Sequence, residues 1–343
     1  VKEETPYLRS DIDWISKPPA GEDCPSDAAF RTGVVRKIMN ADGTNAFTPV
    51  PANQIDGAST GYVVAGVDLG EPGQPEEDGR LVGEAERGGE PEESGAATAR
   101  DTKPKEVKSG NFLTLFDVGR NKDGSARIPR TGRRISVPTY KSPPAAPQRG
   151  SLALLSTLDG RLTNAQEAVD PATGRRLLYT QHTIAGGAGS MVRWYRIDPG
   201  RAGAVAYSIS HPTLYVYNGA ISTDRVRRGD TKAFGDMVVV GVSTSSANHR
   251  IQIRMASKVR DQPMSPLVVV RTSTGPHEDF TCFGEDGEPA VCRWGDYSAA
   301  TPDPAASPSG AHGIVWLTNM WSGIGEPVFG ANYWRTWSWA ARI

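Results

Sequence analysis

Acidic and aromatic side chains of ligand-binding type stand at turns that precede strand-like segments. Asp296 and Tyr297 follow a glycine and precede three small residues, and Asp236 follows a glycine in a similar setting 60 residues earlier. Small residues suit a strand that crowds close to its neighbours, and glycine allows a close backbone approach. His182 stands in a third strand-like segment. We therefore expect Asp236, Asp296 and His182 to approach one axis, with Tyr297 bordering a ligand site there.

Calcium is one ligand that such a site could hold. Carboxylates together with backbone carbonyls are the oxygen donors that Ca²⁺ takes in proteins. In the alternative, each aspartate accepts backbone N–H bonds and only fixes its own turn, and this is the reading we favour. The aspartates that recur at turns or strand starts are Asp170, Asp198, Asp236, Asp296 and Asp303.

The histidines and serines follow no catalytic motif. None of the five histidines has HxxxH or HxH spacing, and no Gly-x-Ser-x-Gly segment occurs. A Ser-His-Asp triad could be assembled from segments far apart in the sequence, but the sequence does not indicate one. No catalytic residue is therefore assigned, and we favour binding over enzymatic chemistry.

Tryptophan is concentrated near the C-terminus, where six of the eight residues fall between Trp294 and Trp339. Indole rings stack well on sugar rings, and they also fill space between packed sheets. We expect most of them to serve packing.

The cysteine pattern predicts a disulfide between Cys282 and Cys292. The intervening segment Gly284–Pro289 is rich in turn residues and can bring the two strand ends side by side. Two buried free thiols are the alternative, and zinc is not expected because no CxxC or nearby paired histidine completes a ligand set. A disulfide implies export to an oxidising compartment. Cys24 has no assigned partner, and the polar start Val1–Glu4 suggests a mature N-terminus.

Composition excludes several classes of protein. The chain has 343 residues with 38 Lys and Arg against 39 Asp and Glu, so no basic field favours nucleic acid. Its 38 Gly and 26 Pro argue against a helical bundle. No apolar stretch is long enough to span a membrane.

Short apolar runs predict an all-β chain. From about residue 150 such runs of four to eight residues recur, are rich in β-branched and aromatic side chains, and are separated by turn residues. Residues 163–169 could form one helical turn at most. Residues 70–108 hold eleven acidic and six basic residues and no aromatic one, which predicts a flexible, disordered acidic insertion within one domain spanning 1–343.

Internal similarity favours a β-propeller. Three segments, starting at Asn164, Phe234 and Trp294, each combine a strand of small residues, a polar turn and an apolar strand. Blades of four strands take about 40–50 residues each. We expect about six blades, with five or seven as alternatives.

Two further segments resemble secreted bacterial proteins of the sialidase-like β-propeller type. They are Leu178–Pro199 and Cys292–Pro304, the latter followed by Val315–Asn319, and Ala126–Pro129 is similar to the Phe/Tyr-Arg-Ile-Pro motif of that family. The resemblance implies a secreted or cell-surface β-propeller that binds a protein or a glycan. The alternative is a glycan-directed hydrolase that works through two carboxylates.

Overall fold

The protein is all-β, as the sequence predicts. The computed structural model describes residues 9–16, 31–69, 109–201, 203–228, 232–284, 287–295, 298–305, 307–308, 312–323 and 334–342. Within these ranges the single helical element is a 3₁₀ turn, η1 (Phe280–Cys282). The predicted acidic insertion at 70–108 lies outside them, and the single-domain assignment stays a prediction.

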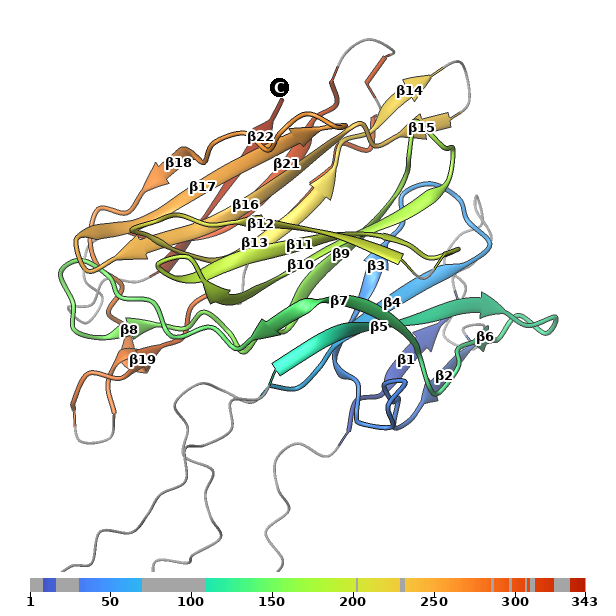
Figure 1. The fold of residues 1–343 in the computed structure, drawn as a ribbon, viewed down its shortest axis with the longest axis horizontal. Helices are drawn as coiled ribbons and strands as arrows, with labels where there is room; N and C mark the ends of the chain where they lie inside the picture. The colour runs from blue at the N-terminus through green and yellow to red at the C-terminus, as the bar shows by residue number, and fades with distance from the viewer. Residues whose placement is uncertain are drawn as a thin grey trace, which may run out of the picture.

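Four antiparallel groups of strands follow one another along the chain (Figure 1). The first contains β3 (Phe47–Asn53), β4 (Gly61–Gly66), β5 (Ser109–Arg120) and β7 (Arg133–Lys141). The second contains β9 (Leu162–Val169), β10 (Arg176–Gly186), β11 (Gly189–Asp198) and β12 (Gly203–Ile209). The third contains β13 (Tyr215–Thr223), β16 (Met237–Ser246), β17 (His249–Val259) and β18 (Val268–Thr272). The fourth contains β20 (Ala299–Pro302), β21 (Val315–Ser322) and β22 (Trp334–Ala341).

The remaining strands are short, and most of them lie outside the four groups. Two hairpins, β1–β2 and β14–β15, and the parallel pair β8–β19 form small sheets of their own, and β6 extends one end of β5. Their bounds are β1 (Ile12–Ile15), β2 (Thr32–Val35), β6 (Ala126–Arg127), β8 (Leu154–Leu155), β14 (Val226–Arg228), β15 (Lys232–Phe234) and β19 (Val291–Cys292).

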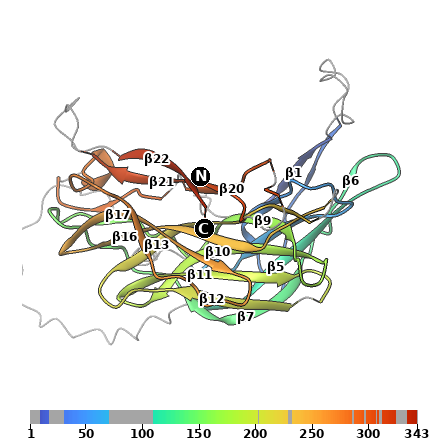
Figure 2. The same ribbon diagram turned by 90° about the horizontal axis from the view of Figure 1, so that it is seen from above.

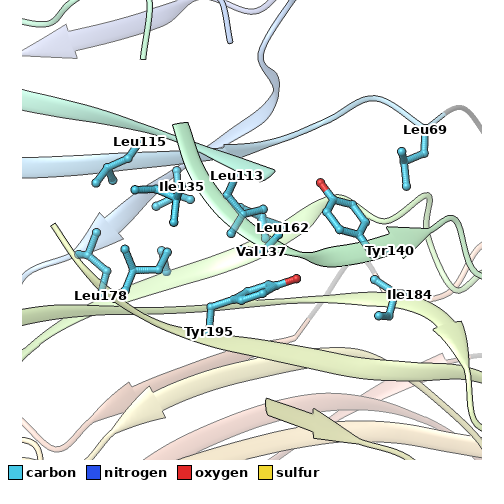
Figure 3. Close-up of a cluster of buried hydrophobic side chains, with 13 residues drawn as sticks. Leu69, Leu113, Leu115, Ile135, Val137, Tyr140, Leu162, Leu178, Ile184 and Tyr195 are labelled. Atoms are coloured by element: carbon cyan, nitrogen blue, oxygen red, sulfur yellow. The ribbon is translucent and has the colours of Figure 1, made fainter. Parts of the chain in front are cut away.

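The groups pack face to face in sequence order, and Figure 2 shows β21 and β22, then β16 and β17, then β10 to β12 in succession. One apolar core lies between β4, β5 and β7 on one side and β9, β10 and β11 on the other (Figure 3). A second core fills the space between β10–β12 and β13, β16 and β17. A third joins β16 to β21 through Val239 and Leu317. The middle groups are therefore covered on both faces.

Coverage on both faces explains the residues of the middle strands. A strand that is exposed on one face alternates apolar and polar side chains, whereas one covered on both faces carries a continuous apolar run. All side chains of β16 from Met237 to Ser245 are buried, and so are those of β10 from Leu177 to Ile184. The apolar first halves of both strands follow from their place in the stack, and the polar side chains after them are buried as well.

The first strands of successive groups lie next to one another. β3 pairs with β9 in parallel through Ala52 and Ala165. β9 is joined to β13 by the side chain of Asn164, whose Nδ2 donates to Ile221 O at 2.8 Å while its Oδ1 accepts from Ile221 N at 3.2 Å. A single amide side chain therefore imitates one rung of a β-ladder between two sheets.

Neither a closed barrel nor a propeller is found in the described part of the chain, so the predicted six blades are not confirmed. The internal similarity also joined unlike elements. The segment from Asn164 contains the first two strands of its group, β9 and β10, whereas the segment from Phe234 leads into β16 and β17, the second and third strands of theirs. The β14–β15 hairpin lies between β13 and β16, the first and second strands of the third group, so this group does not have the strand spacing of the second group.

The Asn164 bonds give a test of how the sheets are held together. Asn164→Ala should lower the free energy of unfolding by about 2–4 kcal/mol, because it leaves the N–H and C=O groups of the fully buried Ile221 without these partners. Urea unfolding measures the change. Asn248→Ala, in an exposed turn, is the control and should shift stability by less than about 0.5 kcal/mol. Equal effects of the two changes would contradict this role.

Candidate functional site

Of the residues predicted to share an axis, the structure describes His182 and Asp236, and these two lie in different environments. Asp296 and Tyr297 lie outside the described residues. Gly295, just before them, has a φ of +94°, and a Cβ built there would lie 1.9 Å from Asn218 Nδ2. A glycine is therefore required at the entrance to β20, where the backbone approaches β13.

His182 is a core residue of β10. Its side chain is fully buried, with Nδ1 2.8 Å from Gly160 O and Nε2 2.9 Å from the hydroxyl of Tyr195. Tyr140 contacts the ring edge-on at a centroid distance of 4.6 Å. Burial lowers the pKa of His182 to about 4, so the imidazole is neutral at pH 7. Its two ring nitrogens thus connect β10 to β11, through Tyr195, and to the turn that contains Gly160.

Asp236 lies at the start of β16, in a different environment. Its carboxylate accepts two bonds from the guanidinium of Arg260, at 3.1 and 2.6 Å, which raises the pKa of Arg260. The backbones of the two residues are also hydrogen-bonded, because Arg260 N donates to Asp236 O at 3.0 Å. Asp236 borders a pocket on the face of β10 that carries Tyr179, whereas His182 points to the opposite face.

This pocket lies between the second and third groups of strands. It has a volume of about 330 Å³ and is bounded by β10, β11 and β12 on one side and by β16 and β17 on the other. The turn at 170–173 and the loop at Gly235 and Asp236 border it at one end. We refer to it as the inter-sheet pocket. Its size is at the lower end of the range for small-molecule sites.

Aromatic side chains form one wall of the inter-sheet pocket. Trp194 of β11 and Tyr207 of β12 are register partners, and their rings stack at a centroid distance of 4.0 Å and an angle of 15°. Tyr179 of β10 lies on the same wall, and burial raises the pKa of its phenol. Trp194 Nε1 is buried without a hydrogen-bond partner among the described residues. An indole donor normally finds a partner when it is buried, so this N–H is an unsatisfied donor at the edge of the pocket.

Basic side chains from β11, from β17 and from the residue after β17 also line this pocket. Arg196 is the register partner of Tyr179, and the Lys258 ammonium lies 5.5 Å from the centre of the Tyr207 ring while donating to Gln262 O. Neither has a carboxylate partner among the described residues. Arg260, in contrast, is committed to Asp236. The pocket thus offers two positive charges that form no ion pair with a described acidic side chain, and Asp261 also borders it.

Local backbone features hold the pocket open. Gly235 N donates to Val169 O, and a Cβ at Gly235 would lie 2.8 Å from Thr223 Cβ, so only glycine lets the β16 loop come this close. Beside it, Asp170 Oδ2 accepts from the Thr173 hydroxyl at 2.5 Å and shapes the β9–β10 turn. Arg260 has a φ of 43°, an unusual conformation for a residue with a Cβ. The two hydrogen bonds from the Arg260 guanidinium to the Asp236 carboxylate hold this conformation in place.

The other aspartates considered for calcium are turn residues in the described structure. Asp198 binds the side chain of Arg175 and the backbone N–H of Gly200, and Asp303 accepts from Ala305 N and Trp316 Nε1. No group of three carboxylates in the described ranges lies close enough to share an ion. Calcium therefore stays a prediction without a site in this part of the chain.

The cysteines lie where the sequence predicts. Cys282 and Cys292 are at disulfide distance, with sulfur atoms 2.11 Å apart, and both are fully buried. Of the tryptophans, Trp294 and Trp321 are buried, whereas Trp316, Trp334 and Trp337 are 46%, 38% and 39% exposed. Packing thus accounts for some of the C-terminal tryptophans and not for all.

Sequence reasoning missed most of the inter-sheet pocket. Trp194 and Arg196 are two residues apart on β11 and therefore share a face, and Tyr179 and Tyr207 join them only through strand pairing. The alternation of an aromatic and a basic residue in Ser190–Ile197 is the one signal that could have pointed to it. Lys258 gave no signal, because its partner strand could not be known.

No protein family, curated protein or solved structure matches the chain. In the described residues there is no helix long and apolar enough to cross a membrane. The resemblance to sialidase-like propellers therefore stays a prediction.

The neutral state of His182 makes stability depend on pH. Its folded pKa of about 4 is below the unfolded value of 6.5, so its contribution is fully present above pH 6.5 and is lost as the pH falls toward 4. The loss should reach about 3 kcal/mol at pH 4. His182→Gln should be less stable at pH 7 and should lack this dependence. Urea unfolding of both proteins between pH 7 and pH 4 measures it, and parallel pH curves would contradict it.

Proposed function

We propose that this protein is a binding module that recognises an acidic glycan in the inter-sheet pocket. The observation that carries the proposal is the stacked Trp194–Tyr207 pair beside Arg196 and Lys258, two cations without a described carboxylate partner. A protein partner, the other class that the sequence suggests, needs a broad surface more than a pocket of about 330 Å³.

The aromatic wall suits a sugar ring. The apolar face of a pyranose packs on an aromatic ring, and its hydroxyl groups require hydrogen-bond partners at the edges. Tyr207 is partly exposed, and Trp194 supports it from behind. The unpartnered Nε1 of Trp194 and the Tyr179 hydroxyl would serve as donors. The pocket has room for about one sugar residue, so a longer chain would continue outside it.

The charges favour an anionic sugar over a neutral one. Arg196 and Lys258 extend from different sheets, and a carboxylate or sulfate bound between them would form an ion pair with each. Hydrogen bonds to charged groups contribute about 1.5–3 kcal/mol each. A uronic acid, with one ring and one carboxylate, matches both the aromatic wall and the charges.

Hydrolysis, the alternative, finds less support in the same residues. A glycosidase requires one carboxyl group as acid and a second as nucleophile or base. In the pocket, Asp236 is bound to Arg260, and Asp170 is bound to Thr173 in its own turn. Of the three carboxylates that border the pocket, only that of the exposed Asp261 lacks such a partner among the described residues. One carboxylate does not make the required pair, so binding is the better proposal.

An extracellular location belongs to the same proposal. The disulfide-distance pair Cys282–Cys292 supports it, because disulfides persist in oxidising compartments. We also retain a propeller-like arrangement as a proposal. It is supported by consecutive antiparallel groups that pack face to face and by first strands that neighbour one another.

Titration of monosaccharides tests the binding proposal. Glucuronic and galacturonic acid should quench or shift the tryptophan fluorescence with a dissociation constant near the millimolar range. Glucose and galactose should bind about tenfold more weakly, since they lack the charge. In the Arg196→Gln/Lys258→Gln variant, the uronic acids should bind as weakly as the neutral sugars. Affinity for uronic acids should also fall with added salt.

A matched control separates this site from general charge effects. Arg254→Gln removes a cation from the same strand as Lys258 but outside the pocket, where Arg254 binds the side chain of Gln252. It should leave uronic-acid binding unchanged. The proposal is wrong if the uronic acids do not bind, or if the double variant binds them as well as the original protein does.

A further inference from the structure

A histidine lies beside the two cysteines at disulfide distance. One ligand atom each from His277, Cys282 and Cys292 lies within 4.8 Å of the others, and all three residues are fully buried. In the described part of the chain this is the one group of its kind. The donors of a tetrahedral zinc lie roughly 3.3–3.8 Å from one another, so small side-chain rotations would bring these three into range.

The fold positions the histidine independently of the disulfide. The side-chain amide of Gln148 bonds twice to the backbone of His277, since its Oε1 accepts from His277 N at 2.7 Å and its Nε2 donates to His277 O at 2.9 Å. Cys282 ends η1, and Cys292 ends β19, which pairs with β8. Three separate elements therefore converge on this point.

Asp279 is placed to orient the imidazole. Its Oδ2 lies 3.4 Å from His277 Nε2, while its Oδ1 accepts from the backbone and hydroxyl of Thr281. A carboxylate on one ring nitrogen of a histidine directs the other nitrogen toward a metal and raises its basicity.

We propose that His277, Cys282 and Cys292 bind Zn²⁺ when the cysteines are reduced, and that the disulfide is the oxidised, metal-free state of the same site. Two thiolates with one imidazole form a donor set that suits zinc. Asp279 acts as a positioning residue. None of these residues borders the inter-sheet pocket, so the inference does not depend on the proposed glycan binding.

The interconversion requires a thiol reductant. A dithiol gives two electrons and two protons, the Cys282–Cys292 bond breaks, and the reductant becomes a disulfide. Zn²⁺ then replaces the two thiol protons, which pass to solvent, and two Zn–S bonds form while His277 adds its neutral nitrogen.

The experiment uses the full chain carrying Cys24→Ser, so that the only thiols are those of the site. The protein is produced in a reducing cytoplasm with added Zn²⁺, and a second sample is oxidised in air. The reduced sample should contain one zinc per chain by elemental analysis, and the oxidised one none. Cobalt, used in place of zinc, should give thiolate charge-transfer absorption and quench Trp294, whose ring lies 5.1 Å from that of His277.

Variants assign the ligands. Asp279→Asn should weaken zinc binding about 10–100-fold in competition with a chromophoric chelator, and His277→Gln should weaken it further. His249→Gln, at an exposed histidine, is the matched control and should have no effect. Peptide mapping of the oxidised variants shows whether Cys282 and Cys292 still pair, and therefore whether the local fold is intact.

Two results would overturn the proposal. One is a Cys282–Cys292 disulfide that persists without zinc in the protein from the reducing cytoplasm. The other is zinc binding by the reduced protein no tighter than that of a Cys282→Ser/Cys292→Ser variant. Either result leaves uronic-acid binding untouched.

Discussion

Burial of strands on both faces is the constraint on which the rest of this structure depends. A polar side chain in such a strand has no water to bond to, so its partners must come from neighbouring strands. Gln181 of β10 donates to Thr163 and to the backbone of Gly219, and Asn164 of β9 binds the backbone of Ile221. The bonds to Gly219 and Ile221, which both belong to β13, cross from one sheet to the next. They fix the spacing and register of sheets that apolar packing alone would leave free to slide.

The inter-sheet pocket is a consequence of the same stacking. Along most of their length the two faces meet through aliphatic side chains such as Val192 and Val240. At one end the chain must leave the sheets, and there Gly235 and Arg260 adopt positions that regular strands do not require. The large side chains of Trp194 and Tyr207 fill only part of the space that opens. A packing requirement and a binding surface thus come from the same residues.

The sequence predicts the strand content and the cysteine pair well, and the long-range arrangement poorly. Apolar runs such as Leu177–Thr183 carry their own strand signal, and the turn-rich segment after Cys282 brings Cys292 close without tertiary information. Residues 163–169, in contrast, were expected to form one helical turn at most, and they form β9 because β10 and β3 pair with both of their edges. The inter-sheet pocket and the neighbour of the cysteines, His277, depend on contacts between distant segments. The internally similar segments contain strands of different rank, because the β14–β15 hairpin adds residues between the first and second strands of the third group.

The parallel pairing of β8 with β19 has a consequence for the order of folding. It joins Leu154 to Val291, whereas β9 to β12 follow one another through short turns between them. Contacts that close long loops form more slowly than local ones, because chain entropy opposes them until much of the structure exists. The β9–β12 meander can therefore assemble during synthesis, while the segment that carries both cysteines docks last. Until that segment docks, the two sulfur atoms are accessible to oxidants and reductants, and we therefore expect the redox state of the compartment at that stage to determine whether they are buried as a disulfide or as thiols.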